Sequence, residues 1–185
     1  FIMNNGSKFK VLFIIQPDTR RIWAAVAEKL DAGREFRATL GLLCVAAMLK
    51  DFEDVECQLI DCSASNFGYP ELHEAIKSCN PDLVCMSALT FSFLDVRKSA
   101  QVAKEACPNT KICLGGVHVN LFPAETLNLK EVDYIVHGEG EKPFREMVRA
   151  LKDGNTEAIK SIQGVGCKVG SETILNGPGE IIRDM

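Results

Sequence analysis

Several features that would fix the class of a protein are missing from this 185-residue sequence. Its longest uncharged apolar stretches, residues 39–49 and 83–94, run to about a dozen residues, below the roughly 18–20 that a membrane-spanning helix needs. Its 21 basic and 25 acidic residues are interspersed, so no block of positive charge predicts binding to nucleic acid. We therefore expect a cytoplasmic protein whose partners are neither nucleic acids nor membranes.

Metal-binding spacing is also missing, although the sequence contains eight cysteines. No two of them form a C-x-x-C or C-x-x-x-C pair, which are the spacings typical of structural zinc sites and iron–sulfur loops. Cys44, Cys85 and Cys113 fall within apolar periodic segments instead. We predict reduced thiols and no metal ligands.

The common catalytic signatures are absent as well. We find no nucleophile elbow G-x-S-x-G, no phosphate-binding P-loop, and no G-x-G-x-x-G after the first apolar run. We therefore assign no catalytic residue to this chain.

Five short apolar runs indicate buried strands, because they are mostly continuous rather than alternating. Helical patterns separate them, with apolar residues three and four positions apart. This alternation predicts an α/β fold, a doubly wound parallel five-stranded sheet in the flavodoxin-like (Rossmann-like) order 2-1-3-4-5. The predicted strands are Val11–Gln16, Val55–Asp61, Leu83–Leu89, Lys111–Leu114 and Tyr134–His137.

The pattern changes after Gly154. Two apolar segments, Val165–Val169 and Thr173–Leu175, flank a Gly-Ser pair and predict a small β-hairpin. The Asn-Gly-Pro-Gly run at 176–179 is typical of a linker. We therefore divide the chain into a Rossmann-like domain at 8–153 and a hairpin with linker at 154–185.

Polar and glycine residues follow two neighbouring predicted strands, at the edge where an open α/β sheet binds its ligand. Ser87 and Thr90 supply hydroxyl groups at one strand end, and Gly115 and Gly116 allow close approach of a ligand to the backbone at the next. The alternatives are local: hydroxyl groups also satisfy turn backbones, and two glycines also make an ordinary tight turn.

Three further positions are candidates at this edge. His118 could contact a ligand or pack on the surface, and the run from Gly138 to Glu141 is a flexible turn that opens a helix. The long segment after the first strand carries Trp23, which would either cover a flat ligand or anchor the loop.

The order of these motifs resembles the cobalamin-binding domain at the amino end of cobalamin-dependent radical S-adenosylmethionine enzymes, which include methyltransferases. The resemblance covers about residues 10–152. The residues that carry it are the strand Val11–Gln16, Leu40-Gly41-Leu42-Leu43, Ile60-Asp61, Ser87-Ala88-Leu89, Gly115-Gly116-Val117-His118, Val132-Asp133-Tyr134 and Gly138-Glu139-Gly140-Glu141.

The resemblance implies that cobalamin lies across the carboxyl edge of the sheet with its nucleotide tail between the strand ends. Ser87, Leu89 and Thr90 would contact the tail, while Gly115, Gly116 and Val117 would line its slot, followed by His118. Gly138, Glu139 and Gly140 would stand on the far side of the tail base.

Two departures from related patterns sharpen this expectation. Other cobalamin carriers have D-x-H-x-x-G after the first strand, whereas residues 16–37 contain no histidine, so cobalamin would bind base-off without a histidine as lower ligand. The C-x-x-x-C-x-x-C motif of the radical enzymes is also missing. We therefore expect S-adenosylmethionine and the [4Fe-4S] cluster to bind a radical catalytic domain beyond Met185, and this fragment alone not to be catalytic.

Three alternatives belong to other classes. A receiver domain needs a phosphorylatable aspartate where this third strand ends in Met-Ser-Ala-Leu, and a flavin module needs a glycine-bearing phosphate loop after the first strand. A corrinoid-type domain that has lost its cofactor and serves as an interaction or substrate-recognition module stays open, because its glycine turns would persist for folding reasons.

Overall fold

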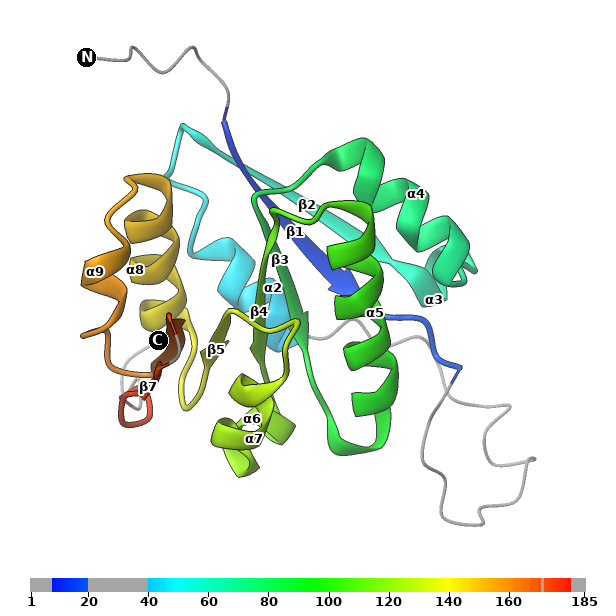
Figure 1. Ribbon diagram of the computed structural model, residues 1–185. Helices are drawn as coiled ribbons and strands as arrows, with labels where there is room; N and C mark the ends of the chain where they lie inside the picture. The colour runs from blue at the N-terminus through cyan, green and yellow to red at the C-terminus, as the bar shows by residue number, and fades with distance from the viewer. Residues whose placement is uncertain (1–7, 20–39, 171, 181–185) are drawn as a thin grey trace.

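One twisted sheet forms the centre of the protein, with helices on both faces (Figure 1). The structure is a computed structural model, and it describes residues 8–19, 40–170 and 172–180. The strands lie in the order β2-β1-β3-β4-β5-β6-β7. Their bounds are β1 Phe9–Ile15, β2 Val55–Asp61, β3 Leu83–Ser87, β4 Lys111–Gly115, β5 Tyr134–Val136, β6 Val165–Val169 and β7 Glu172–Leu175.

The first five strands are parallel and follow the predicted order 2-1-3-4-5. β1 pairs with β2 on one side and with β3 on the other, so the strand order reverses there. The α/β fold class and its flavodoxin-like order are confirmed.

The strand count differs from the prediction, because the hairpin does not stand apart from the sheet. β6 pairs antiparallel with β5, and β7 pairs antiparallel with β6, so the sheet has seven strands instead of five in the part of the chain that the structure describes. β3 also ends at Ser87, two residues earlier than predicted, because the chain then turns into a short 3-10 helix, η1 (Thr90–Ser92).

Helices cover the two faces of the sheet (Figure 1). α4 and α5 lie on one face, and α2 and α8 lie on the other. The short helices α6 and α7 follow β4, and α9 follows α8. The helix bounds are α2 Leu40–Ala47, α3 Cys62–Ser65, α4 Tyr69–Cys79, α5 Phe93–Ala106, α6 Val117–Leu121, α7 Pro123–Asn128, α8 Glu141–Lys152 and α9 Thr156–Ile159.

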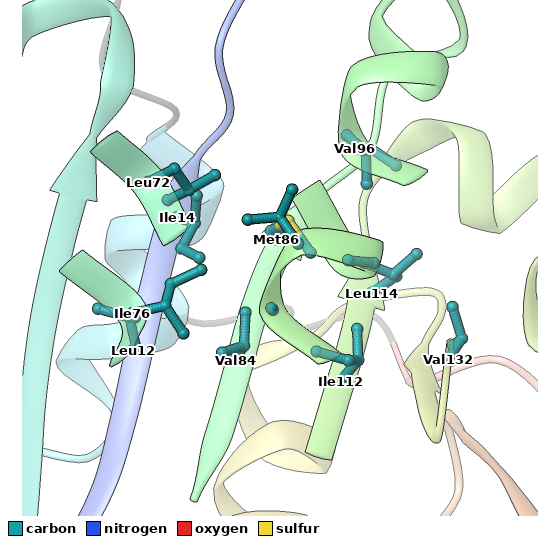
Figure 2. Close-up of a cluster of buried hydrophobic side chains, with 14 of the residues drawn as sticks. Leu12, Ile14, Leu72, Ile76, Val84, Met86, Val96, Ile112, Leu114 and Val132 are labelled. Carbon is teal, nitrogen blue, oxygen red and sulfur yellow. The ribbon is translucent and has the colours of Figure 1, made fainter. Parts of the chain in front are cut away.

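Alternate residues of the strands build two separate cores, because successive side chains point to opposite faces. Figure 2 shows the core under α4 and α5, where side chains of β1, β3 and β4 meet Leu72, Ile76 and Val96. The intervening residues, such as Phe13 and Cys85, pack with α2 and α8 on the other face. Burying each such aliphatic side chain contributes about 1.5–3 kcal/mol to folding.

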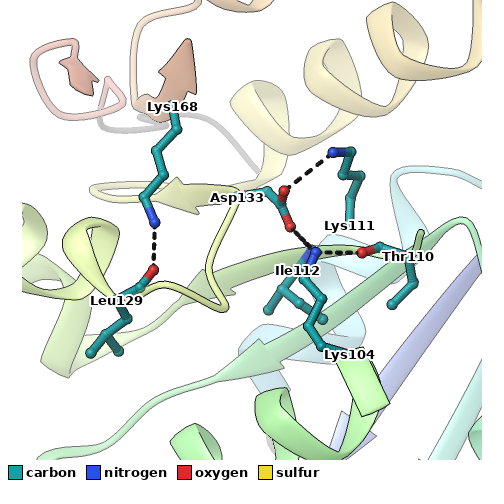
Figure 3. A network of polar contacts seen from close by, with 7 residues as sticks. All are labelled: Lys104, Thr110, Lys111, Ile112, Leu129, Asp133 and Lys168. Carbon is teal, nitrogen blue, oxygen red and sulfur yellow. Dashed lines mark hydrogen bonds and ion pairs between the residues drawn. The ribbon is translucent and has the colours of Figure 1, made fainter. Parts of the chain in front are cut away.

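A polar network ties the amino ends of β4 and β5 together (Figure 3). One carboxylate oxygen of Asp133 accepts the backbone N–H of Ile112 at 2.9 Å and the Lys104 ammonium at 2.7 Å. Lys111 lies 3.3 Å from the other oxygen. Asp133 therefore fixes the register of these two strands at the edge opposite the predicted site.

No helix within the described ranges is both long and apolar enough to cross a bilayer.

Candidate cofactor site

A cavity of about 210 Å³ opens at the carboxyl ends of β1, β3, β4 and β5, between α2 and α8. We call this cavity the slot. Its floor is formed by strand side chains, its walls by the two helices, and its rim by residues at the strand ends and just after them. The floor includes Phe13, Cys85 and Cys113, the walls Leu42, Val45 and Phe144, and the rim Ser87, Gly115, Gly116 and Gly138–Glu141.

The floor of the slot is apolar and uncharged. Cys85 and Cys113 are paired neighbours on β3 and β4, and both thiols are free and buried. Burial raises the pKa of the Cys85 thiol well above its usual range, with a further contribution from its hydrogen bond with Cys113. This thiol is therefore protonated at neutral pH and packs as a small hydrophobic group.

Six of the ten predicted site residues line the slot. They are Ser87, Gly115, Gly116, Gly138, Glu139 and Gly140. The other four, Leu89, Thr90, Val117 and His118, belong to η1, its cap and the start of α6, and the slot lining does not include them. The structure thus brings together the two glycine turns and Ser87, and separates them from the hydroxyl of Thr90.

The turns after β3 and β4 are joined to each other by backbone hydrogen bonds. The Ala88 N–H donates to the Gly115 carbonyl at 2.7 Å, and the His118 N–H donates to the Ala88 carbonyl at 2.9 Å. Gly116 has a φ of +98°, and a β-carbon there would lie 2.9 Å from the Ala88 nitrogen. Only glycine fits this close approach, so folding alone accounts for Gly116.

Gly115 and Gly140 behave differently from Gly116. A β-carbon at Gly115 would come no closer than 3.4 Å to the Val136 carbonyl oxygen, and one at Gly140 no closer than 3.4 Å to its neighbours. A β-carbon at either residue would therefore not clash with neighbouring backbone atoms. The absence of a side chain at these two glycines leaves space in the slot instead.

His118 packs outside the slot. Its ring stacks on Phe93 with centroids 3.8 Å apart, and its Nδ1 lies 3.2 Å from the Thr90 hydroxyl. Burial lowers the pKa of His118 below its usual range, with a smaller opposing contribution from Glu125. The ring is therefore neutral at pH 7 and held as a packing residue.

The other histidines lie elsewhere. His137 is buried behind the rim, and its Nε2 donates to the Asn176 carbonyl at 2.8 Å, while His73 on α4 contacts Glu74. All three histidines of the sequence fall in the described ranges, and none lines the slot. Trp23 lies outside the described residues.

Within the part of the chain that the structure describes, no cluster of three or more histidine, cysteine or acidic side chains could hold a metal ion. The sequence analysis named Leu42 only as part of the motif 40–43, and it assigned no site role to the other wall residues, Val45 and Phe144. Their spacing on α2 and α8 identifies an apolar face but not the gap left between that face and the sheet.

Fold and slot together define an open-sheet ligand-binding domain of the α/β class, with its cavity beside the strands where the order reverses. Residues 37–148, more than half of the chain, match the model of the B12 binding domain family. The chain belongs to this family, and the predicted resemblance is confirmed.

Curated relatives share this region. An uncharacterized methyltransferase of Pyrococcus horikoshii is 32% identical over 149 residues, which are 79% of this chain and 31% of that protein. An anaerobic magnesium-protoporphyrin IX monomethyl ester cyclase of Cereibacter sphaeroides is 28% identical over 80% of this chain and 24% of its own length. The cobalamin-dependent radical SAM methyltransferase TokK of Streptomyces tokunonensis is 32% identical over 53% of this chain and 14% of its own.

Solved structures share the fold. The radical S-adenosylmethionine methyltransferase TsrM of Kitasatospora setae, solved with cobalamin and a [4Fe-4S] cluster, superposes with a TM-score of 0.72 at 16% identity, over 96% of this chain and 30% of that one. The cobalamin-dependent S-adenosylmethionine radical enzyme OxsB superposes with a TM-score of 0.65 at 15% identity, over 95% of this chain and 23% of OxsB. The chain is thus a cobalamin-binding domain related to radical SAM methyltransferases, and it spans about a third or less of these proteins.

Proposed function

We propose that this chain holds base-off cobalamin with the nucleotide tail in the slot, as the cofactor domain of a larger radical SAM methyltransferase. The observation that carries the proposal is the slot itself. It opens at the carboxyl edge between α2 and α8, and its lining residues from Gly41 to Glu141 lie within the region that matches the family model.

The residues of the slot fit a flat apolar group bearing a polar chain. Phe13, Phe144 and the neutral thiol of Cys85 offer apolar contact to a ring. Gly115 and Gly140 leave open space above them, while the Ser87 hydroxyl and the backbone of the rim supply polar contacts. Apolar walls with a few polar groups at the rim are typical of cofactor sites.

The positions of the histidines support a base-off state without a histidine ligand to cobalt. Imidazole is the commonest protein ligand to a metal, but residues 16–37 after β1 contain no histidine, and none of the three histidines of the chain lines the slot. Bound cobalamin supplies a cobalt centre that can carry a methyl group. This chain's residues would bind its tail and keep water from the base.

Methyl transfer is proposed for the parent protein because two of the relatives reported above are methyltransferases. S-adenosylmethionine and the [4Fe-4S] cluster would belong to the rest of such a protein, since this sequence has no C-x-x-x-C-x-x-C motif.

The test is a titration of the purified chain with hydroxocobalamin, followed by visible absorption and by gel filtration to detect co-migration. We expect saturable binding of one cofactor per chain. Absence of binding would contradict the proposal and favour the alternative, an interaction or substrate-recognition module without cofactor.

A matched pair of variants locates the tail. Gly41 lines the slot, and a β-carbon there would meet no heavy atom within 4 Å, so larger side chains fit without strain and suit α2 at least as well as glycine. Gly41→Leu should fill the slot and weaken hydroxocobalamin binding by roughly tenfold or more, whereas Gly41→Ala should bind nearly as the wild type does. Equal binding by all three would place the tail elsewhere.

A further inference from the structure

The chain returns to the carboxyl edge of the sheet after β7 and lies against the turn that follows β5. We call residues 176–180 the exit strap. Gly179 pairs with Gly138 in an isolated parallel bridge, and its N–H donates to the His137 carbonyl at 2.9 Å. Because the turn from Gly138 to Gly140 forms one rim of the slot, the strap lies directly behind that rim.

Side-chain anchors hold the exit strap in place. The amide nitrogen of Asn176 donates to three backbone carbonyls at 2.9–3.1 Å, those of Lys160, Ile162 and Val165. The Nε2 of the buried His137 donates to the backbone carbonyl of Asn176 at 2.8 Å. A segment whose composition predicts a linker is therefore fixed by long-range hydrogen bonds to β5, β6 and the end of α9.

The strap and the rim are in direct backbone contact. A β-carbon at Gly138 would lie 2.5 Å from the Gly179 nitrogen, and a β-carbon at Gly179 would clash with the Glu139 carbonyl oxygen. On its other side the rim is held by Asn120 of α6, whose side-chain oxygen accepts the Gly138 N–H at 2.9 Å. The rim is thus clamped between α6 and the exit strap, and it has no room to move toward the strap.

We propose that Asn176, His137 and Gly179 are positioning residues of the cofactor site: they dock the exit strap, and the docked strap fixes the Gly138–Gly140 rim in the shape that accepts the cobalamin tail. This inference rests on the proposed function. Since strap and cofactor would favour the same rim conformation, each should stabilise the other, and the coupling must be reciprocal. The strap would then couple occupancy of the slot to the part of the chain that follows residue 180.

Two variants undock the strap by different means. Asn176→Ala removes the amide that meets three carbonyls, and Gly179→Ala inserts a methyl group between the strap and the Glu139 carbonyl. Asn109→Ala is the control, because Asn109 lies in an exposed turn before β4, at the opposite edge of the sheet. We expect both strap variants to keep the far-ultraviolet spectrum of the wild type, since the cores contain neither residue.

Amide hydrogen exchange, measured by NMR, reports whether the strap is docked, and it needs no bound cofactor. The Gly164 N–H donates to the Gly177 carbonyl and the Gly179 N–H to the His137 carbonyl, so both amides report docking. We expect both amides to exchange roughly tenfold faster in Asn176→Ala than in Asn109→Ala, and the Gly164 amide to do so in Gly179→Ala as well. Saturating hydroxocobalamin should slow both amides in the wild type.

Hydroxocobalamin binding then separates the two hypotheses. We expect each strap variant to bind roughly tenfold more weakly than the wild type and than Asn109→Ala. Unchanged affinity in variants whose strap amides exchange faster would overturn the role of the strap and leave the proposed function intact. Unchanged exchange of the wild-type amides on saturation would overturn the coupling even if a variant failed to fold. A wild type that binds no cobalamin would overturn both.

Discussion

Asp95, a fully buried carboxylate near the start of α5, accepts both the backbone N–H and the hydroxyl of Thr19, at 3.1 and 2.8 Å. The Tyr69 hydroxyl also donates to Asp95. Thr19 lies just beyond β1, so α4 and α5 together fix the direction in which the chain leaves the first strand. Gln16 adds a weaker contact of the same kind, a hydrogen bond of 3.3 Å to Ser92.

Removal of this carboxylate should destabilise the fold. Asp95→Ala removes the carboxylate that accepts hydrogen bonds from Thr19 and Tyr69, and hydrogen bonds to charged groups contribute about 1.5–3 kcal/mol. Thr19→Ala keeps the backbone N–H bond and should lose less, about 0.5–1.5 kcal/mol. Urea unfolding of both single variants and the double variant measures the coupling. Strictly additive losses would show that the two residues do not act together.

Asp133 gives a second test of stability, at the opposite edge of the sheet. Asp133→Asn weakens its contact with the Lys104 ammonium and should lower the free energy of unfolding by about 1–3 kcal/mol, because hydrogen bonds to charged groups are the stronger ones. The control is Glu157→Gln, which weakens an exposed ion pair with Lys160 and should cost less than about 1 kcal/mol. Similar losses in the two variants would mean that the network in Figure 3 contributes no more than a surface pair.

Substitution of the histidines should leave the spectrum of bound cobalamin unchanged. His118→Phe keeps an aromatic ring against Phe93, and His137→Ala removes an imidazole that lies behind the rim. Visible absorption of the loaded variants should match that of the wild type, although His137→Ala should bind more weakly because it loosens the exit strap. A shifted cobalt band in either variant would identify that histidine as a ligand and contradict the proposal that no histidine binds cobalt.

Stability should fall at alkaline pH. Burial raises the pKa of Cys62 from 9.0 to about 12, with a smaller contribution from Asp61, and burial raises the pKa of Tyr134 from 10.0 to about 12. Between these values the unfolded chain releases protons that the native protein retains, so the free energy of unfolding decreases as pH rises. Below about pH 9 both states keep these protons and the two groups contribute no slope.

Cys62→Ala isolates one of these groups. It should make the decline above about pH 9 shallower than in the wild type, whatever its effect on stability at neutral pH. Urea unfolding at several pH values between about 7 and 11 measures both slopes. Parallel curves for the two proteins would show that Cys62 ionises alike in the folded and unfolded states.

The parallel sheet could be predicted from the sequence because each strand is a short, continuous apolar run between helical patterns. The turns after β3 and β4 could be predicted because their glycine and serine residues follow those runs directly. Thr90 and His118 were assigned to the same edge, but the chain turns through η1 and α6 within a few residues. A strand end predicts an edge of the sheet, not which side of it a side chain reaches.

The floor and walls of the slot were not predictable in the same way. Cys85, Leu42 and Phe144 have the pattern of core residues, and a cavity arises only where opposing faces fail to meet. The exit strap was predicted as a linker because Asn, Gly and Pro favour turns locally. The hydrogen bonds of Asn176 reach residues 11–16 positions away, which no local pattern encodes.

The antiparallel hairpin of β6 and β7 has a practical consequence, because its two reversals bring residue 180 back to the edge where β5 ends. Glu180 shares a shallow cavity with Glu139, which also lines the slot. A fluorescent dye attached at position 180 would therefore lie beside the proposed cofactor site. Since corrinoids absorb visible light, loss of the dye's emission would make this chain an optical sensor for vitamin B12.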